Sequence, residues 1–540
     1  MIKINRTAKS MMIKLTHRLL ASTLWLLSTL VGAAESADDG VGPFDIARYT
    51  VSGDTLLGST SIDQLLTPFI GKQRHFGDVQ LAVDALQTAY RDRGFSLVKV
   101  QLPEQELNQG VIQLNVRQTP ISAVRVLGNT VFGEKNIRHS MPGLREGETL
   151  NLTNVSASLA LANENPAKKT TLSLQSAEDD ASVVATLQVA DEKAWATSLS
   201  LDNAGGEKTG QTQFTAQVQH FNVAGVDHAL SLQFTTTVEQ PSRVGVYGVG
   251  YHIPLYALGD SVDFYANYSD VDSGTVTTGS FSVQVSGKGT TWGGRYNHRL
   301  ARVGNLTSTL VFGLEQKAFQ NNLGFQGVQL GHDVTVRPLT LTYSGELTDP
   351  GSSTSWSLTG VRNMPGGDNA GESDYASTRS QASANYSVVR YSVSHSRALP
   401  ADWRLRATLS GQLTGDALVP GEQFGAGGAN SVRGFTERAL SDDQGQLASI
   451  ELYTPSLCAI TAMPALQCQL LVFYDAAQVR HNKALPAERG EASIASAGIG
   501  LRLSVGKQLS LQMDLGQVTQ GGDLAAIGDQ RVHVKLNLAY

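Results

Sequence analysis

The feature that most constrains this chain is a one-by-one alternation of apolar and polar residues, which recurs from Trp195 to Tyr540. Successive side chains of a strand point to opposite faces, so a period of two gives each strand one apolar and one polar face. Strands that contact lipid outside and water inside show this pattern. We therefore predict a transmembrane β-barrel over 195–540. In its last strand the apolar residues are Val532, Val534, Leu536, Leu538 and Tyr540, alternating with His533, Lys535, Asn537 and Ala539.

The connections between strand candidates favour a barrel over a soluble β-sandwich, whose turns would be uniformly short. About sixteen antiparallel strands are expected, including an alternating segment at Phe281–Val285, and bacterial barrels have even numbers. Long loops on one side and tight turns on the other are typical of the outer membrane, and both barrel ends then lie in the periplasm. A barrel this wide has an aqueous lumen that needs a plug. The long connections are Asp270–Gly279, Asn321–Asp333, Pro365–Ala384, Ala417–Gln444, Arg480–Ala492 and Thr519–Asp529, and the short ones are Val223–Val226, Leu300–Gly304, Pro400–Asp402 and Gly506–Gln508.

The N-terminal segment is typical of a secretory signal peptide. Five basic residues precede an apolar run from Leu19 to Val31, and small residues follow up to Ala34. The run is short for spanning a bilayer, which favours a cleaved signal peptide at 1–34 over an uncleaved membrane anchor. Removing five positive charges and no negative ones changes the formal charge from -6 to -11. The mature chain therefore has no basic surface of the size that binds nucleic acid.

Two small α+β units are expected in the periplasm, at 44–118 and 119–191, after a short segment at 35–43. Leu81, Ala82, Ala85 and Tyr90 form the expected apolar stripe of a helix in the first unit. The second unit repeats the order β-α-α-β-β. The elements of the first are an extended piece Asp45–Val51, helices Ser61–Leu66 and Val79–Arg93, and strands Ser96–Leu102 and Gly110–Val116. Those of the second are a strand and turn at Val124–Asn129, helices Glu134–Met141 and Asn154–Asn163, and strands Leu172–Gln175 and Val183–Val189.

The two cysteines, Cys458 and Cys468, lie between neighbouring strand candidates. An exported chain folds in an oxidising compartment, so we predict that a disulfide joins them. A metal site is the competing interpretation, but two thiols without a nearby histidine do not make one. Two unpaired thiols are the other alternative. No metal and no cofactor are expected.

The strongest candidate for a functional residue is Arg433, in the Gly-rich loop Gly421–Glu437. A loop arginine at a barrel either reaches water, with at most a weak surface ion pair, or finds a carboxylate inside. The strand motif Phe473-Tyr474-Asp475 offers a carboxylate, and Phe473 and Asp475 are two apart, so they share a face. Glu451 is a weaker second candidate. The arginine belongs to the motif Val432-Arg433-Gly434-Phe435.

The two periplasmic units, the barrel, the Val432–Phe435 loop motif and the Phe473/Asp475 strand motif together resemble a known family. The chain is similar to the outer-membrane transporters of two-partner secretion (TpsB), the exporters of haemolysin and filamentous haemagglutinin, whose periplasmic units are POTRA (polypeptide-transport-associated) domains. In that family the sixth extracellular loop folds into the lumen and its arginine pairs with the strand aspartate. The resemblance thus implies a latch between Arg433 and Asp475, with Gly434 allowing a sharp turn and Phe435 wedged in the lumen.

The resemblance also implies a function, and the chain departs from the family in one respect. Members often carry an N-terminal helix and linker that thread the pore, but only about nine residues precede the first unit here, so loop 421–444 is predicted to be the main plug. The implied function is export of a large exoprotein, an adhesin or haemolysin, across the bacterial outer membrane, with activation of the haemolysin by some members. The POTRA-like units would capture the N-terminal secretion domain of the partner by strand addition at Ser96–Leu102 or Leu172–Gln175.

The remaining partners implied are the lipid bilayer and the barrel-assembly machinery that would insert the chain. An outer-membrane assembly insertase of the same superfamily is the alternative function, and a diffusion porin is a more distant one, since a porin needs no periplasmic units. An enzyme is not expected, because the chain contains no HExxH or GxSxG motif and its 11 histidines are scattered.

Overall fold

The structure is a computed structural model that describes residues 42–540, apart from 54–55, 107–108, 178–181, 207–208, 243, 271–273, 279–280, 286–287, 321–323, 326–327, 330–331, 459–464 and 487. The signal peptide predicted at 1–34 and nearly all of segment 35–43 lie outside the described residues. The chain divides into two compact units, Met1–Gln118 and Thr119–Tyr540. The first boundary coincides with the end of the first periplasmic unit expected from the sequence.

The first unit, which we call domain 1, contains a three-stranded sheet in the order β2-β5-β4, with β2 and β5 parallel. A second, two-stranded sheet joins β1 and β3. The predicted strand Ser96–Leu102 is reduced to three residues, because the chain from Phe95 to Val98 forms a turn. The elements are β1 (Phe44–Ile46), β2 (Arg48–Ser52), α2 (Ser59–Leu66), β3 (Gly71–Arg74), α3 (Phe76–Asp92), β4 (Lys99–Gln101) and β5 (Val111–Arg117).

Helix α3 begins earlier than the sequence suggested and buries a different stripe. The carboxylate of Asp78 accepts a hydrogen bond of 2.9 Å from the backbone N–H of His75, which caps the first turn. The prediction that Leu81 belongs to the buried stripe is wrong, because its side chain is 57% exposed. The stripe instead follows an i, i+3, i+7, i+11 spacing that keeps one face on the sheet. Its members are Val79, Ala82, Leu86 and Tyr90.

Residues 119–191, which we call domain 2, have the predicted β-α-α-β-β order. Their sheet runs β6-β8-β7, so β7 lies at one edge. The carboxylate of Asp191 accepts backbone hydrogen bonds from Thr130, Val131 and Phe132 and one from the Thr130 hydroxyl. Partial burial acts to raise the pKa of Asp191, but these hydrogen bonds outweigh it and lower the pKa to about 2. The elements are β6 (Ile121–Leu127), α4 (Glu134–His139), α5 (Leu152–Ala162), β7 (Lys168–Ser176) and β8 (Val183–Asp191).

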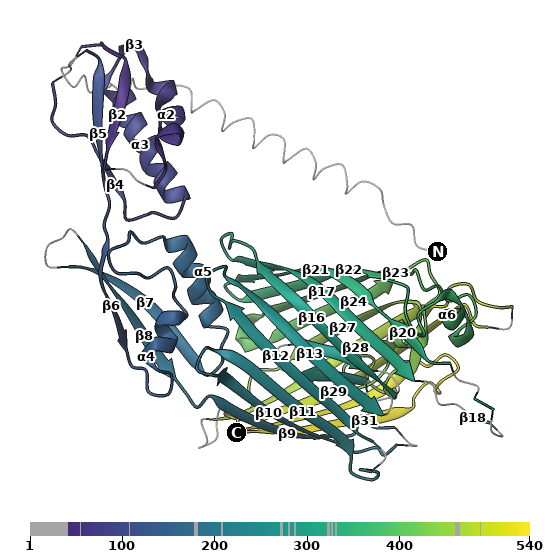
Figure 1. Cartoon of the computed structure of the whole chain (residues 1–540). Coiled ribbons are helices and arrows are strands. Elements are labelled where there is room, and N and C mark those ends of the chain that lie inside the picture. The colour runs from purple at the N-terminus through teal and green to yellow at the C-terminus, as the bar shows by residue number, and fades with distance from the viewer. Residues whose placement is uncertain are drawn as a thin grey trace, which may run out of the picture. The chain divides into compact units, whose positions relative to one another are not determined.

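The rest of the chain forms one closed antiparallel barrel (Figure 1). Its ladder contains seventeen segments, of which β20 and β21 both pair with β17 and form a single strand interrupted at Arg337, leaving sixteen strands. The predicted fold class is thus confirmed. The segments are β9 (Trp195–Asp202), β10 (Gln213–Val223), β11 (His228–Thr237), β12 (Val246–Leu255), β13 (Asp260–Asp270), β16 (Lys288–Arg299), β17 (Leu306–Gln320), β20 (Val334–Val336), β21 (Pro338–Asp349), β22 (Ser352–Asn363), β23 (Ser387–Ala398), β24 (Arg404–Leu413), β27 (Gln444–Tyr453), β28 (Leu466–Arg480), β29 (Glu491–Val505), β30 (Leu509–Gln520) and β31 (Gln530–Ala539).

The alternation in the sequence corresponds to the two faces of the barrel wall. Leu232 is 48% exposed on the outside, whereas its neighbour Ser231 is only 3% exposed on the inside. The same contrast holds for Phe264 and Asp263. The outer surface of the barrel, which contacts the membrane, is therefore apolar, and the lumen is polar. No helix in the described part of the chain is long and apolar enough to cross a membrane.

The connections differ between the two ends of the barrel. Domain 2 lies at one end, where α4 and α5 contact the turns 224–227 and 256–259. The connections at the opposite end are numbered here as loops 1 to 8, and α6 (Glu372–Thr378) lies in one of them, at the end remote from α5 (Figure 1). Loop 5 comprises 364–386, loop 6 comprises 414–443 and loop 7 comprises 481–490.

Loop 3 gives a correction to the strand assignment. The alternating segment Phe281–Val285 is not a barrel strand, because it pairs with β14 (Gly274–Thr278) as a separate hairpin, β15, inside the loop. The barrel strand that follows is β16. Alternation marks a two-faced strand but not which partner it pairs with, so it does not separate a hairpin in a loop from the wall.

Candidate functional site

Loop 6 turns back into the barrel through a small hairpin of its own. After a turn at Pro420–Glu422, β25 (Phe424–Ala426) pairs with β26 (Leu440–Asp442) in antiparallel fashion. The hairpin carries 427–439, the part of the loop that contains Arg433, at its tip. The sequence predicts this loop at 421–444. In the structure it begins earlier, at Thr414, and ends at Asp443, because Gln444 is the first residue of β27.

Arg433 and Asp475 form the central contact of this tip. The guanidinium donates from Nε to Oδ2 of Asp475 at 2.7 Å and from Nη2 to Oδ1 at 2.8 Å, a bidentate arrangement. The backbone N–H of Arg433 also donates to Oδ2, at 3.2 Å. The side chain of Arg433 is 6% exposed and that of Asp475 is fully buried. The two predicted partners are thus brought together in a site that excludes water, where removing one charge strands the other.

Three further wall residues complete the surroundings of the guanidinium. Its Nη1 donates to Oε1 of Glu451 at 2.8 Å and lies 3.6 Å from Asp514. The ring of Phe473 lies beneath it, with the guanidinium carbon 3.5 Å from the ring centroid. The weaker candidate Glu451 and the motif residue Phe473 both contact Arg433 directly. The carboxylates come from β27, β28 and β30, so one side chain joins three wall strands.

The backbone of the loop approaches the wall at a glycine. A Cβ at Gly516 would lie 2.6 Å from the nitrogen of Gly434 and 2.7 Å from the carbonyl carbon of Arg433, so no side chain fits there. Gly434 has a φ of 96°, which favours glycine, and its N–H donates to Nε2 of His533 at 3.1 Å. Position 434 favours glycine because of its backbone conformation, and position 516 requires glycine because the loop backbone lies against it.

The two apolar residues of the loop motif bury themselves against the wall. Val432 and Phe435 are shielded from solvent and belong to one cluster with inward-facing residues of three strands. Burying two such side chains is worth roughly 3–6 kcal/mol relative to exposing them. The tip is therefore held by apolar packing against the wall as well as by ion pairs. The wall residues of this cluster are Ala477 and Val479 of β28, Ile494 of β29 and Val518 of β30.

The cysteines lie away from this site. Cys458 and Cys468 are joined by a disulfide with their Cα atoms 5.3 Å apart. The bridge closes the connection between β27 and β28, which is at the same end of the barrel as domain 2. It therefore restrains a turn.

Sequence reasoning missed five residues that complete the site. The hydroxyl of Ser449 donates to Asp475 at 2.6 Å, while Arg502 holds Asp514 through two bonds of 2.9 Å. Gly516 and His533 receive the loop backbone. Alternation places Asp514 on the inward face of its strand, so an inward carboxylate was a usable signal. Nothing in the local sequence marks Gly516, whose partner is 82 residues away in the chain.

The arrangement can act as a plug with a releasable fastening. A guanidinium stays charged at any physiological pH, so Arg433 does not leave its partners by losing its proton. Among the described residues, no group of histidine, cysteine or carboxylate side chains is arranged to hold a metal ion.

Comparisons with known proteins agree with this architecture. Residues 180–503 match the model of the haemolysin secretion/activation protein family ShlB/FhaC/HecB, and residues 44–119 match the ShlB-type POTRA domain. The chain is 25% identical over 457 residues to the outer membrane transporter CdiB of Escherichia coli O6:K15:H31 (strain 536 / UPEC), covering 81% of this chain and 74% of that protein. It is 23% identical over 454 residues to the heme/hemopexin transporter protein HuxB of Haemophilus influenzae (strain ATCC 51907 / DSM 11121 / KW20 / Rd), covering 82% and 77%.

Solved structures share the fold. CdiB from Escherichia coli superposes with a TM-score of 0.73 at 20% identity, covering all of both chains. BamA from Haemophilus ducreyi lacking POTRA domains 1–3 gives a TM-score of 0.52 at 17% identity, covering 92% of this chain and all of that one. The match of the family model extends over more than half of the chain. The family expected from the sequence is confirmed: the chain belongs to the ShlB/FhaC/HecB family, the outer-membrane transporters of two-partner secretion, with its POTRA domains in the periplasm.

Proposed function

We propose that this transporter recognises one large exoprotein in the periplasm and exports it through the barrel to the cell surface. The observation that carries the proposal is the seating of loop 6 in the lumen by Arg433. The loop is fixed at its tip to side chains of three wall strands and is not itself a strand of the barrel ladder. It can therefore leave the lumen without breaking that ladder. A fixed constriction or an open diffusion pore needs no such fastening.

The edge of domain 2 at β7 supports periplasmic capture by strand addition. Asn163 bonds both the N–H and the C=O of Thr170, so the backbone of Thr170 points away from β8. By the period of two, Leu172, Leu174 and Ser176 point the same way. No strand in the described part of domain 2 pairs with this edge. β7 has nine residues and β4 of domain 1 only three, so we assign the exoprotein to β7.

The first experiment tests the plug. Cells that express the transporter together with its exoprotein are compared with cells in which the transporter carries Arg433→Ala. We expect export into the medium to fall at least tenfold, because Asp475 loses its partner and the tip loses its seat, while the barrel remains inserted. Heat-modifiable gel mobility checks insertion. Unchanged export by an inserted Arg433→Ala barrel rules out this role for loop 6. Lysis of erythrocytes by the same supernatants reports haemolysin activation separately.

The second experiment tests capture. Leu174→Pro removes a backbone N–H that points outward from β7. Val126→Pro is the matched change on β6. Side chains bond both the N–H and the C=O of Val124, so the backbone of Val124, and by the period of two that of Val126, points away from β8. We expect Leu174→Pro to reduce co-purification of the exoprotein N-terminal region, while Val126→Pro leaves it intact. Equal effects of the two variants contradict β7 as the docking edge.

The alternative function, assembly of outer-membrane proteins, makes a different prediction for a deletion strain. Loss of an insertase lowers the levels of many barrels, whereas loss of an exporter removes one exoprotein from the medium. Quantitative proteomics of outer membranes and of culture medium separates the two outcomes. A general loss of barrels supports the insertase and contradicts our proposal.

A further inference from the structure

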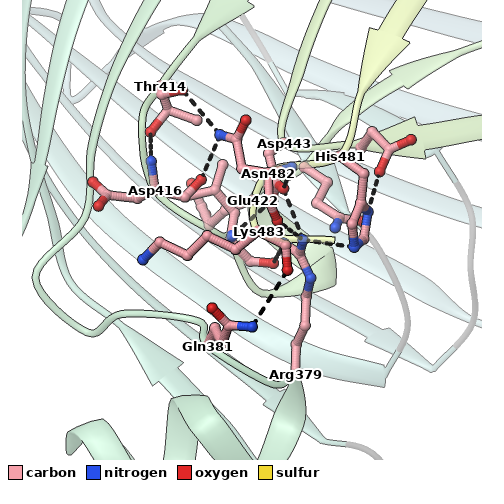
Figure 2. A network of polar contacts seen from close by, with 12 residues as sticks. Arg379, Gln381, Thr414, Asp416, Glu422, Asp443, His481, Asn482 and Lys483 are labelled. Carbon is pink, nitrogen blue, oxygen red and sulfur yellow. Dashed lines mark hydrogen bonds and ion pairs between the residues drawn. The ribbon is translucent and has the colours of Figure 1, made fainter. Parts of the chain in front are cut away.

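Loop 6 has a second attachment, at its base, formed by Arg379, Asp443 and Asn482 (Figure 2). We call these three residues the outer clasp. Arg379 follows helix α6 in loop 5, Asp443 is the last residue of loop 6, and Asn482 lies in loop 7. Three neighbouring loops thus meet at one guanidinium. Ser449, whose cross-strand partner is Asp475, lies six positions after Asp443 along the chain, so the two attachments lie about 20 Å apart.

Asp443 is fully buried and fully bonded. Both of its carboxylate oxygens accept from Arg379, one from Nη1 and the other from Nη2 at 2.7 Å. The backbone N–H groups of Leu418 and Asn482 add bonds of 2.7 Å each. The carboxylate therefore ties the start of loop 6 to its own end and to loop 7. Removing the guanidinium leaves a buried charge without a counter-ion.

Arg379 is held in place by a helix that is fixed to the wall. Tyr375 of α6 is fully buried, donates to the carbonyl of Thr335 at 3.1 Å and accepts from Asn363 at 2.8 Å. Arg379 also donates to the carbonyl groups of Leu418 and Asn482, at 2.8 and 3.1 Å. Helix α6, which is fixed to the wall, thus positions the guanidinium of Arg379 against loops 6 and 7.

Asn482 spans the two ends of loop 6. Its Nδ2 donates to the carbonyl groups of Thr414 and Asp416 at 2.9 and 2.8 Å (Figure 2). Its Oδ1 accepts from Gln444 at 2.6 Å. Thr414 is the first residue of the loop, and Gln444 is the first residue after it. Loop 6 cannot swing about its base while these bonds hold, because both ends are tied to the same side chain.

We propose that Arg379 locks the base of loop 6 and that the loop leaves the lumen only when the Arg379–Asp443 pair opens as well as the Arg433–Asp475 pair. Arg379 is a positioning residue, since it fixes the loop and does not contact a transported chain. The two fastenings hold different parts of the loop through different wall elements. They therefore contribute separately to keeping the lumen closed.

Channel recordings test this without any exoprotein, so the result stands whether or not the proposed export is correct. Purified full-length transporter in planar bilayers is compared with its Arg379→Ala variant. Gln381→Ala is the matched control. Gln381 lies in the same loop, is exposed, and its side chain donates a long bond of 3.5 Å to the carbonyl of Lys483. We expect at least a tenfold rise in open time for Arg379→Ala, no change for Gln381→Ala, and partial recovery in Arg379→Lys, which keeps the charge but loses the fork.

The double variant with Arg433→Ala tests independence. For separate fastenings the two fold-changes in open time multiply. An unchanged open time in Arg379→Ala, or no added effect of Arg379→Ala in the Arg433→Ala background, overturns the proposal. Heat-modifiable gel mobility shows whether each variant is folded. If Arg379→Ala does not fold, Asp443→Asn removes the same charge pair and keeps the size of the side chain, and an unchanged open time in that variant overturns the proposal equally.

Discussion

Lys168 of domain 2 lies with its ammonium group 2.5 Å from the carboxylate of Asp227, in the turn between β10 and β11, and both side chains are shielded from solvent. Lys168 also bonds Asn136 at 3.2 Å, and the hydroxyl of Tyr256 donates to Asp227 at 2.7 Å. A buried ion pair with additional hydrogen bonds thus joins the periplasmic domain to the barrel mouth.

This pair predicts how domain 2 responds to the loss of one charge. Lys168→Met leaves Asp227 buried and unpaired, which costs about 3–5 kcal/mol locally. We expect faster hydrogen exchange in the β10–β11 turn and in α4, measured by mass spectrometry on the full-length protein. The double variant Lys168→Met/Asp227→Leu removes both charges and should restore much of the protection. Equal exchange in wild type and Lys168→Met contradicts the importance of the pair.

Gly516 predicts a steric effect on loop 6. A methyl group there meets the backbone of Arg433 and Gly434, which cannot move aside without lifting the tip. Gly516→Ala is therefore expected to weaken the seat of loop 6 and raise channel open time severalfold. Gly360→Ala is the control, because Gly360 lies in strand β22 with no atom within 4 Å of an added Cβ. Indistinguishable recordings from the two variants argue against the close approach.

The geometry around Asp475 predicts that a positive charge alone is insufficient at position 433. Lysine at position 433 keeps a positive charge but cannot bond both oxygens of Asp475 and Glu451 together. We expect Arg433→Lys to retain an inserted barrel and to lose most of the export seen in wild type, assayed by exoprotein in the medium. Wild-type export by Arg433→Lys shows that a point charge suffices.

The lowered pKa of Asp191 predicts a pH dependence in domain 2. Because the pKa is about 2 in the folded protein, below the ordinary aspartate value of 3.8, the ionised carboxylate stabilises the fold at pH values above 3.8. This contribution is lost as pH falls from about 4 toward 2. Asp191→Asn should therefore increase exchange at 130–132 at pH 6, after correction for intrinsic rates, and the difference from wild type should disappear near pH 2. A difference that persists at pH 2 contradicts ionisation as the cause.

Local sequence patterns predicted most of the fold. Period-two alternation identified the strands, and the spacing of Phe473 and Asp475 placed both on the same face. The same reasoning failed at Phe281–Val285, because alternation does not identify the pairing partner. It also misplaced Leu81 in the stripe of α3, since a helix face is chosen by the sheet that it covers.

The sequence by itself determined which residues face lipid and which face the lumen, because a strand assigns its two faces by position alone. The resemblance to a family suggested Arg433 and Asp475 as partners. Only the tertiary structure brought Gly516 beneath the loop backbone and Arg379, Asp443 and Asn482 together from three loops. Those contacts join residues far apart in the chain, and barrel closure decides which of them become neighbours.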